Sequence, residues 1–335
     1  MKSYVLNIAD YKIRFENPEG NIDLMPSGRY SGFLSATENH DVCIRVFPGD
    51  TELPAGTQKV FSAPYVEEIN GLRLKKKDRF WSVHKKDDTL YILTEFPFSG
   101  DNRTGLLRFS LESRNWDLFL NSSSIRTGSS DQVFGADPMD YLPDRGCRAE
   151  PADGAVSPPQ ADPMDYPLDG LILYYLTVIH GDIMIHASGI NSGGKGFMFS
   201  GVSGKGKSTM AGLWDRHGAR VIHDDRLIIR KVRGSYSMFN TPVYRNDEAR
   251  ESPLDAIFII EHGTENEALR LHGASAITSL LSNCIQHNWD EAVIRQSLDA
   301  AIRICASIPV FQLRFRPDNS IIAYLLQQVK TNESG

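Results

Sequence analysis

The sequence has little cysteine, no long uninterrupted apolar run and no large excess of either charge. Its cysteines form no CxxC pair, which argues against both a zinc site and a disulfide framework. They are Cys43, Cys147, Cys284 and Cys305. The most apolar stretch, residues 168–190, is interrupted by aspartates and histidines that would be costly inside a bilayer. The first ten residues lack the apolar core of a secretory signal. We therefore expect a reduced, cytoplasmic protein without a membrane span.

The formal net charge of -6 argues against general binding to nucleic acid or to a membrane surface. A chain of 335 residues favours about two domains and can bury a sizeable core. Hydrophobic residues make up 41% and charged residues 23%, which is ordinary for a globular protein.

The clearest motif is Gly201-Val-Ser-Gly-Lys-Gly-Lys-Ser-Thr209, which fits the P-loop (Walker A) spacing G-x-x-x-x-G-K-[ST]. The apolar run 196–200 predicts a buried strand before it, and residues 209–217 predict a helix closed by Gly218. Backbone N–H groups of such a loop, together with a helix N-terminus, bind phosphate. An ordinary glycine-rich turn would leave the lysine and serine unexplained. The predicted nucleotide-binding residues are Gly201, Ser203, Gly204, Lys205, Gly206, Lys207, Ser208 and Thr209.

Two adjacent carboxylates, Asp224 and Asp225, end the strand predicted over residues 219–225. Phosphoryl transfer needs a cation on the nucleotide phosphates and a group that orients or deprotonates the acceptor hydroxyl. The pair follows Ser208 by 16 residues, which leaves room for a helix and a return strand beside the loop. Ser208 can supply one Mg²⁺ ligand and a carboxylate another. Adjacent acids also occur as turn formers or helix caps.

Upstream, residues 168–179 predict an apolar helix, with a strand as the alternative. Residues 183–190 predict a buried strand that carries His186. A buried histidine bonded to backbone is the alternative for this residue. Further on, residues 255–261 and 310–316 predict strands. Residues 289–307 predict a helix with one buried face. That face is expected to carry Ile294, Leu298, Ala301 and Cys305.

The first 121 residues predict a β-rich domain, with alternating strands such as 11–16 and 42–46. Residues 122–166 predict a linker rich in proline and serine. This composition favours a mobile connection. It contains Ala-Asp-Pro-Met-Asp-Tyr twice, at 136–141 and at 161–166. The repeat is either a local duplication or a docking or metal motif. Residues 167–328 then form the third segment, a P-loop domain. The expected fold class is α+β.

The P-loop, the helix after it and His217-Gly-Ala-Arg-Val-Ile-His-Asp-Asp225 resemble the kinase domain of HPr kinase/phosphorylase. More narrowly, they are similar to divergent members found with peptide natural-product genes, including lasso-peptide kinases and the SynChlorMet cassette kinase-like protein. The fold is shared distantly with ATP-dependent phosphoenolpyruvate carboxykinase. The resemblance covers residues 168–260 well and the rest to residue 326 loosely, and it implies an α/β kinase domain.

The resemblance implies a role for each matching position. Lys207 would hold the β- and γ-phosphates of ATP, and Ser208 would ligate Mg²⁺. Asp224 would be the general base and Asp225 the second metal ligand, although these two roles could be exchanged. His186 would lie near the transferring phosphate. Arg245 falls where related kinases place a basic residue, with a surface arginine as the alternative.

Two departures from the family argue against HPr itself as the acceptor. The loop continues as Thr209-Met-Ala instead of an acidic residue and a T-A-L-type run, and the glycine- and arginine-rich loop used with HPr is absent. The leading hypothesis is an ATP- and Mg²⁺-dependent kinase that phosphorylates a hydroxyl, with serine of a peptide or protein as the expected acceptor. A nucleotide-binding regulatory or scaffold module is the alternative, as is phosphotransfer to a small molecule. The acceptor, the choice between ATP and GTP and the oligomeric state stay open.

Overall fold

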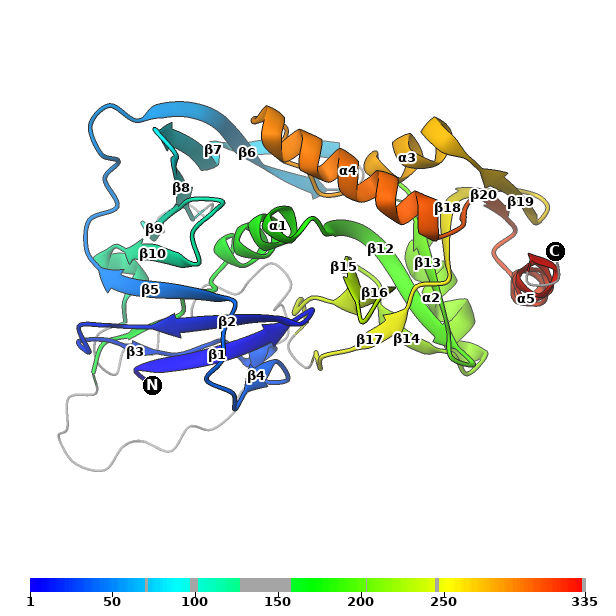
Figure 1. Cartoon of the computed structure of the whole chain (residues 1–335), viewed down its shortest axis with the longest axis horizontal. Helices are drawn as coiled ribbons and strands as arrows, with labels where there is room; N and C mark the ends of the chain where they lie inside the picture. Colours follow the sequence, from blue (N-terminus) through cyan, green and yellow to red (C-terminus); the bar gives the residue numbers. More distant parts are fainter. Residues whose placement is uncertain (70–71, 97–101, 127–157, 203, 245–246, 333–335) are drawn as a thin grey trace. The chain divides into compact units, whose positions relative to one another are not determined.

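The computed structural model describes residues 1–69, 72–96, 102–126, 158–202, 204–244 and 247–332. The first copy of the repeated hexapeptide, Cys147, Ser203 and Arg245 lie outside these residues. The chain divides into two compact units. One comprises Met1–Ile172 and Pro242–Glu248, and the other comprises Leu173–Thr241 and Ala249–Gly335 (Figure 1).

The first unit is built on a nine-stranded sheet in the order β4-β1-β2-β5-β10-β9-β8-β7-β6. The predicted strand 11–16 is confirmed as β2, in which Tyr11, Ile13 and Phe15 are buried on alternate positions. This alternation is what one covered face of a sheet requires. The strands are β1 (Ser3–Ile8), β2 (Tyr11–Glu16), β4 (Leu34–Ser35), β5 (Val42–Pro48), β6 (Gln58–Ile69), β7 (Leu72–Lys86), β8 (Thr89–Glu95), β9 (Thr104–Phe109) and β10 (Asn115–Leu120).

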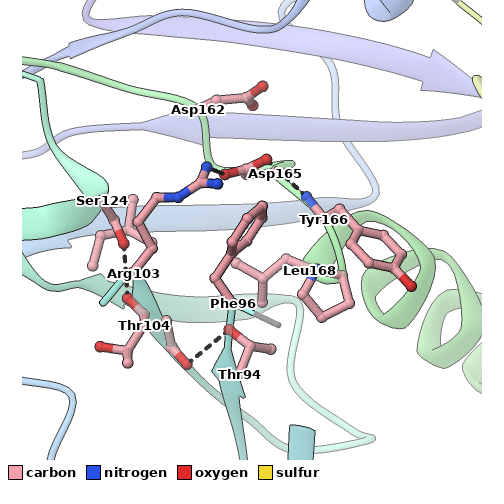
Figure 2. A pocket seen from close by; sticks show the side chains of 12 residues that line it. Thr94, Phe96, Arg103, Thr104, Ser124, Asp162, Asp165, Tyr166 and Leu168 are labelled. Atoms are coloured by element: carbon pink, nitrogen blue, oxygen red, sulfur yellow. Dashed lines mark hydrogen bonds and ion pairs between the residues drawn. The ribbon is translucent and has the colours of Figure 1, made fainter. Parts of the chain in front are cut away.

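The second copy of the repeated hexapeptide packs within the first unit, although its composition favoured a mobile connection. Residues Gln160–Ala161 form β11, which pairs in parallel with β3 (Asp23–Leu24). Asp162 accepts hydrogen bonds from the backbone N–H groups of Ser27 and Met164. Asp165 pairs with Arg103 (Figure 2). These half-buried acids therefore serve as internal hydrogen-bond partners. Among the described residues, no group of three or more His, Cys, Asp or Glu side chains is placed to hold a metal.

The second unit contains another nine-stranded sheet, in the order β17-β16-β15-β12-β13-β18-β20-β19, with β14 also paired to β12. Strands β13, β18 and β20 run parallel, so their carboxyl ends share one edge. The strands are β12 (Ile183–Ser192), β13 (Lys195–Ser200), β14 (Arg220–His223), β15 (Arg226–Val232), β16 (Ser235–Asn240), β17 (Glu251–Pro253), β18 (Ala256–His262), β19 (Glu267–Leu271) and β20 (Val310–Phe315).

Helices cover both faces of this sheet. One core joins α3 and α4 to Met198 and Ile257, and the other joins α2 and α5 to Phe197 and Phe258. Neighbouring residues of one strand enter opposite cores because strand side chains alternate. The helices are α1 (Leu168–His180), which spans both units in sequence, α2 (Lys207–Arg216), α3 (Gly273–Leu281), α4 (Glu291–Ser307) and α5 (Ser320–Asn332). In Figure 1 the orange helices are α3 and α4.

The predicted buried face of α4 is wrong at Ile294 and Leu298, whereas the predicted burial of Ala301 is confirmed. Ile294 and Leu298 are 43% and 39% exposed, whereas Val293 and Ile304 are buried with Ala300 and Ala301. The helix carries two adjacent apolar stripes, and a shift of one residue rotates the face by about 100°. The alanines face the sheet, which allows a closer approach of the helix backbone. Cys305 packs against this core as a half-buried residue.

The chain as described is thus a mixed α/β structure with two large sheets and few helices. In the described residues, no helix combines the length and the apolar character needed to cross a membrane.

Candidate active site

The predicted strand, turn and helix of the P-loop motif are all present. Strand β13 ends at Ser200, the turn follows, and α2 begins at Lys207. Gly204 and Gly206 adopt φ values of +78° and +93°, where side chains other than glycine are strained. A Cβ at Gly206 would also approach Phe315 to 2.9 Å. Both glycines are therefore required by the path of the loop.

Lys207 is folded into its own loop. The side chain is buried, and its Nζ donates hydrogen bonds to the carbonyls of Gly201 at 2.7 Å and Val202 at 3.4 Å. Burial lowers the pKa of the ammonium group, while the negative charge of Asp225 acts in the opposite direction. These two carbonyl bonds satisfy the cation within the loop.

The side chains of His186 and Asp225 are hydrogen-bonded beside the predicted P-loop. The Nδ1 atom of His186 lies 3.0 Å from Oδ1 of Asp225. The backbone N–H of Ala187 donates to the Asp225 carbonyl at 2.9 Å, and the Ser200 hydroxyl donates to the His186 carbonyl at 3.0 Å. The last bond ties the histidine to the residue that immediately precedes the loop. Strand pairing brings these residues together, because His186 lies opposite Arg226.

The Asp225 carboxyl has a lowered pKa. Burial raises this pKa, but the hydrogen bond from His186 and the positive charge of Arg226 lower it more. The group is therefore ionised at neutral pH and suited to attract a cation. The backbone N–H of Asp225 donates a hydrogen bond to Nδ1 of the buried His223 at 3.1 Å.

Ser208 and Thr209 are more accessible than Asp224. Asp224 is half-buried in the bend between β14 and β15, directly before Asp225. Ser208 and Thr209 are exposed on the first turn of α2. Lys205 is half-buried, and its backbone N–H donates to the Val202 carbonyl at 3.3 Å. The predicted site residues that the structure describes thus lie in the loop, in the start of α2, in β12 and in the bend before β15.

The sequence interpretation missed His262, the last residue of β18. Its Nε2 donates a hydrogen bond to the Gly204 carbonyl at 3.0 Å, so the ring carries its proton on that nitrogen. The ring also stacks on the buried Phe315, with 6.0 Å between centroids. Ligands of open α/β sheets bind outside the carboxyl ends of parallel strands, so the residue that directly follows the predicted strand 255–261 was a detectable candidate.

Comparisons with known proteins cover mainly the second unit. Residues 169–318 match the family described as SynChlorMet cassette protein ScmC. Less than half of the chain is matched. No curated protein matches the chain.

Among solved structures, the chain has a weak similarity to the Hpr(Ser) kinase/phosphatase from Coxiella burnetii. The identity is 9%, the TM-score is 0.28, and the match covers 45% of this chain and 99% of that chain. The ScmC match falls within the region for which the sequence resemblance was drawn, while the narrower family assignment stays a prediction.

The donor set at the loop fits magnesium. This ion prefers oxygen ligands and is usually held by one or two protein groups together with water and phosphate. Asp225 offers an ionised carboxylate, and Ser208 offers an exposed hydroxyl on the first turn of α2. The glycine-formed loop and the N-terminus of α2 fit a phosphate group on the same grounds.

Proposed function

We propose that the second unit binds ATP with Mg²⁺ at residues 201–209 and transfers the γ-phosphoryl group to a serine hydroxyl of a peptide or protein. The observation that supports this most directly is the hydrogen bond between His186 and Asp225, together with the charge of Asp225 that acts on Lys207. A loop that only bound a nucleotide would not need a largely buried acid bonded to a histidine beside it. The pKa values of Asp225 and Lys207 are both shifted, and groups with shifted pKa values cluster at catalytic sites.

Each residue has a distinct part in the proposal. The loop N–H groups and Lys207 bind the phosphates, and Lys207 exchanges its carbonyl partners for phosphate oxygens. Bound Mg²⁺ supplies charge neutralisation on the β- and γ-phosphates. Ser208 and Asp225 hold that ion. His186 donates Nδ1–H to Asp225 and so fixes the carboxylate orientation.

Asp224 accepts the proton of the serine hydroxyl as the serine oxygen bonds to the γ-phosphorus. The bond from that phosphorus to the β,γ-bridging oxygen breaks, and ADP leaves with the electron pair. The products are a phosphoserine and ADP, and the proton remains on Asp224 until it passes to solvent. The step needs no oxidant and no further reactant.

The test uses the full chain with γ-labelled ATP, MgCl₂ and a library of serine peptides, followed by mass spectrometry. We expect label on serine with the natural sequence and none with Asp224→Asn. Arg216→Gln, an exposed change at the end of α2, is the matched control. Tight ATP binding without transfer to any acceptor would instead favour the regulatory or scaffold alternative, and turnover that depends on an added metabolite would favour a small-molecule acceptor.

A further inference from the structure

A cavity of about 380 Å³ lies in the second unit, away from the predicted P-loop. It is formed where α1 ends, where β12 begins, at the adjoining ends of β15 and β16, and at the last turns of α4. Cavities of this size are typical of binding sites for small ligands or side chains. The residues that matter for its chemistry are Asp182, Arg230, Lys231, Tyr236 and Arg303.

The cavity carries more positive than negative charge. Arg230 Nε lies 3.3 Å from Asp182 Oδ2, and both side chains are largely buried. The positive charge of Arg230 and the negative charge of Asp182 therefore cancel within this pair. Lys231 and Arg303 add two further positive charges on the exposed rim. Among the residues that the structure describes, neither of these two has a carboxylate partner. In a protein of net charge -6, such a local excess attracts an anionic group.

Arg303 is held in place by neutral partners. Its Nη2 donates to the Gly181 carbonyl at 3.1 Å, and its side chain is hydrogen-bonded to the Tyr236 hydroxyl. Gly181 has φ of +67°, and a Cβ there would come within 2.8 Å of Arg303 Nη2. The glycine therefore makes room for the guanidinium. A guanidinium has more N–H donors than these two partners use, and its planar donor array suits carboxylate and phosphate oxygens.

The cavity and the candidate active site share two strands. Asp182 precedes His186 by four residues, and Arg230 follows Arg226 by four residues. His186 and Arg226 lie opposite each other on β12 and β15. The cavity therefore lies four residues from the candidate active site along either strand. Four residues of strand correspond to about 13 Å, which is also the span of about four residues of an extended peptide.

We propose that this cavity binds the carboxylate of an acidic residue in the peptide acceptor, about four residues from the serine that is phosphorylated. This proposal rests on the proposed function, because it takes the peptide acceptor from there. Arg303 and Lys231 bind the carboxylate, and the Arg230–Asp182 pair forms the buried side of the site. Binding at this distance positions the acceptor without involving the P-loop.

The first experiment measures binding without nucleotide. A fluorescent peptide with two aspartates is compared with the same peptide carrying asparagines, using anisotropy at low salt. We expect Arg303→Gln and Lys231→Gln each to weaken binding of the aspartate peptide by about tenfold. Arg295→Gln, an exposed arginine on the same helix, is the charge-matched control and should change nothing. Equal affinity of the two peptides, or unchanged affinity in both cavity variants, would overturn the site.

The second experiment measures transfer to peptides with one serine and one aspartate separated by two, four or eight residues. The transfer rate should be highest at a separation of four, and Arg303→Gln should remove that maximum. A flat profile with the natural sequence would overturn the acceptor role. The binding assay does not depend on catalysis, so Lys207→Ala should leave it unchanged. Absence of transfer to every peptide would count against the proposed function and the acceptor role, while binding still decides whether the cavity takes a carboxylate.

Discussion

His186 Nδ1 lies 3.0 Å from Asp225 Oδ1, across the pairing of β12 with β15. The bond joins a half-exposed histidine to a largely buried carboxylate and fixes which imidazole nitrogen carries the proton. It also places a negative charge where it acts on Lys207. This arrangement leads to the first prediction.

Replacement of Asp225 by asparagine keeps the shape of the side chain but removes its charge. We expect phosphotransfer to fall by about a hundredfold and the Mg²⁺ concentration for half-maximal rate to rise, because a ligand and the partner of His186 are both lost. Steady-state assays across a magnesium titration would measure this. Asp215→Asn, on the exposed side of α2, is the control. An unaltered magnesium dependence would contradict the assignment of Asp225 as a metal ligand.

Replacement of Lys207 by alanine should weaken ATP binding by about ten- to a hundredfold, since charge-assisted bonds to phosphate are lost. Calorimetry on both proteins would measure the change. Burial lowers the lysine pKa, so its proton is lost at a lower pH than that of an exposed lysine. ATP affinity of the natural protein should therefore decline toward alkaline pH, and the variant should show less of this decline. If both proteins had the same pH profile, Lys207 would not contact the phosphates.

His262 should act through the loop backbone. Alanine at this position removes the donor to the Gly204 carbonyl, and we expect ATP affinity to fall about fivefold, as for one neutral hydrogen bond. Glutamine, which keeps an N–H donor of similar reach, should restore part of the loss. An affinity equal to that of the natural protein in the alanine variant would show that the loop does not need this bond.

Asp162 predicts a pH-dependent stability of the first unit. Burial, and then the charge of Asp165, raise its pKa to about 7, so the folded state holds a proton that the unfolded state releases near its ordinary pKa of 3.8. Stability therefore falls as the pH rises from about 4 to 7. Thermal melts of the natural protein and of Asp162→Asn at pH 5 and pH 8 would measure this fall in stability. The loss of stability between the two pH values should be smaller in the variant, and an equal loss would refute the buried environment of Asp162.

The two faces of α4 should respond differently to substitution. Ala300→Leu adds bulk at a buried position outside the face expected from the sequence and should destabilise by about 1–3 kcal/mol. Ile294→Ser changes a side chain that is 43% exposed and should stay within about 0.5 kcal/mol. Denaturant unfolding of both variants measures the difference. A larger loss of unfolding free energy in Ile294→Ser than in the alanine variant would support the buried face expected from the sequence.

Much of the local structure was readable from the chain itself. Alternation predicted β2 and β20, and continuous apolar runs predicted β12, β13 and α1. Turn chemistry placed Gly204, Gly206 and Gly218 correctly, because only glycine adopts their positive φ values without strain. The face of α4 was not fully readable, since two apolar stripes lie one residue apart and only the packing of Val293, Ala300 and Ile304 selects between them.

The sequence by itself determined the P-loop and the adjacent acids, because a glycine pattern and its flanking elements are local properties of the chain. Only the tertiary structure decided which acid pairs with His186, that His262 reaches Gly204, and that Arg303 meets Lys231 at one cavity. These contacts arise from strand register and helix packing between distant segments. Chain order does not encode such distances; they follow from burying apolar side chains on both faces of one sheet.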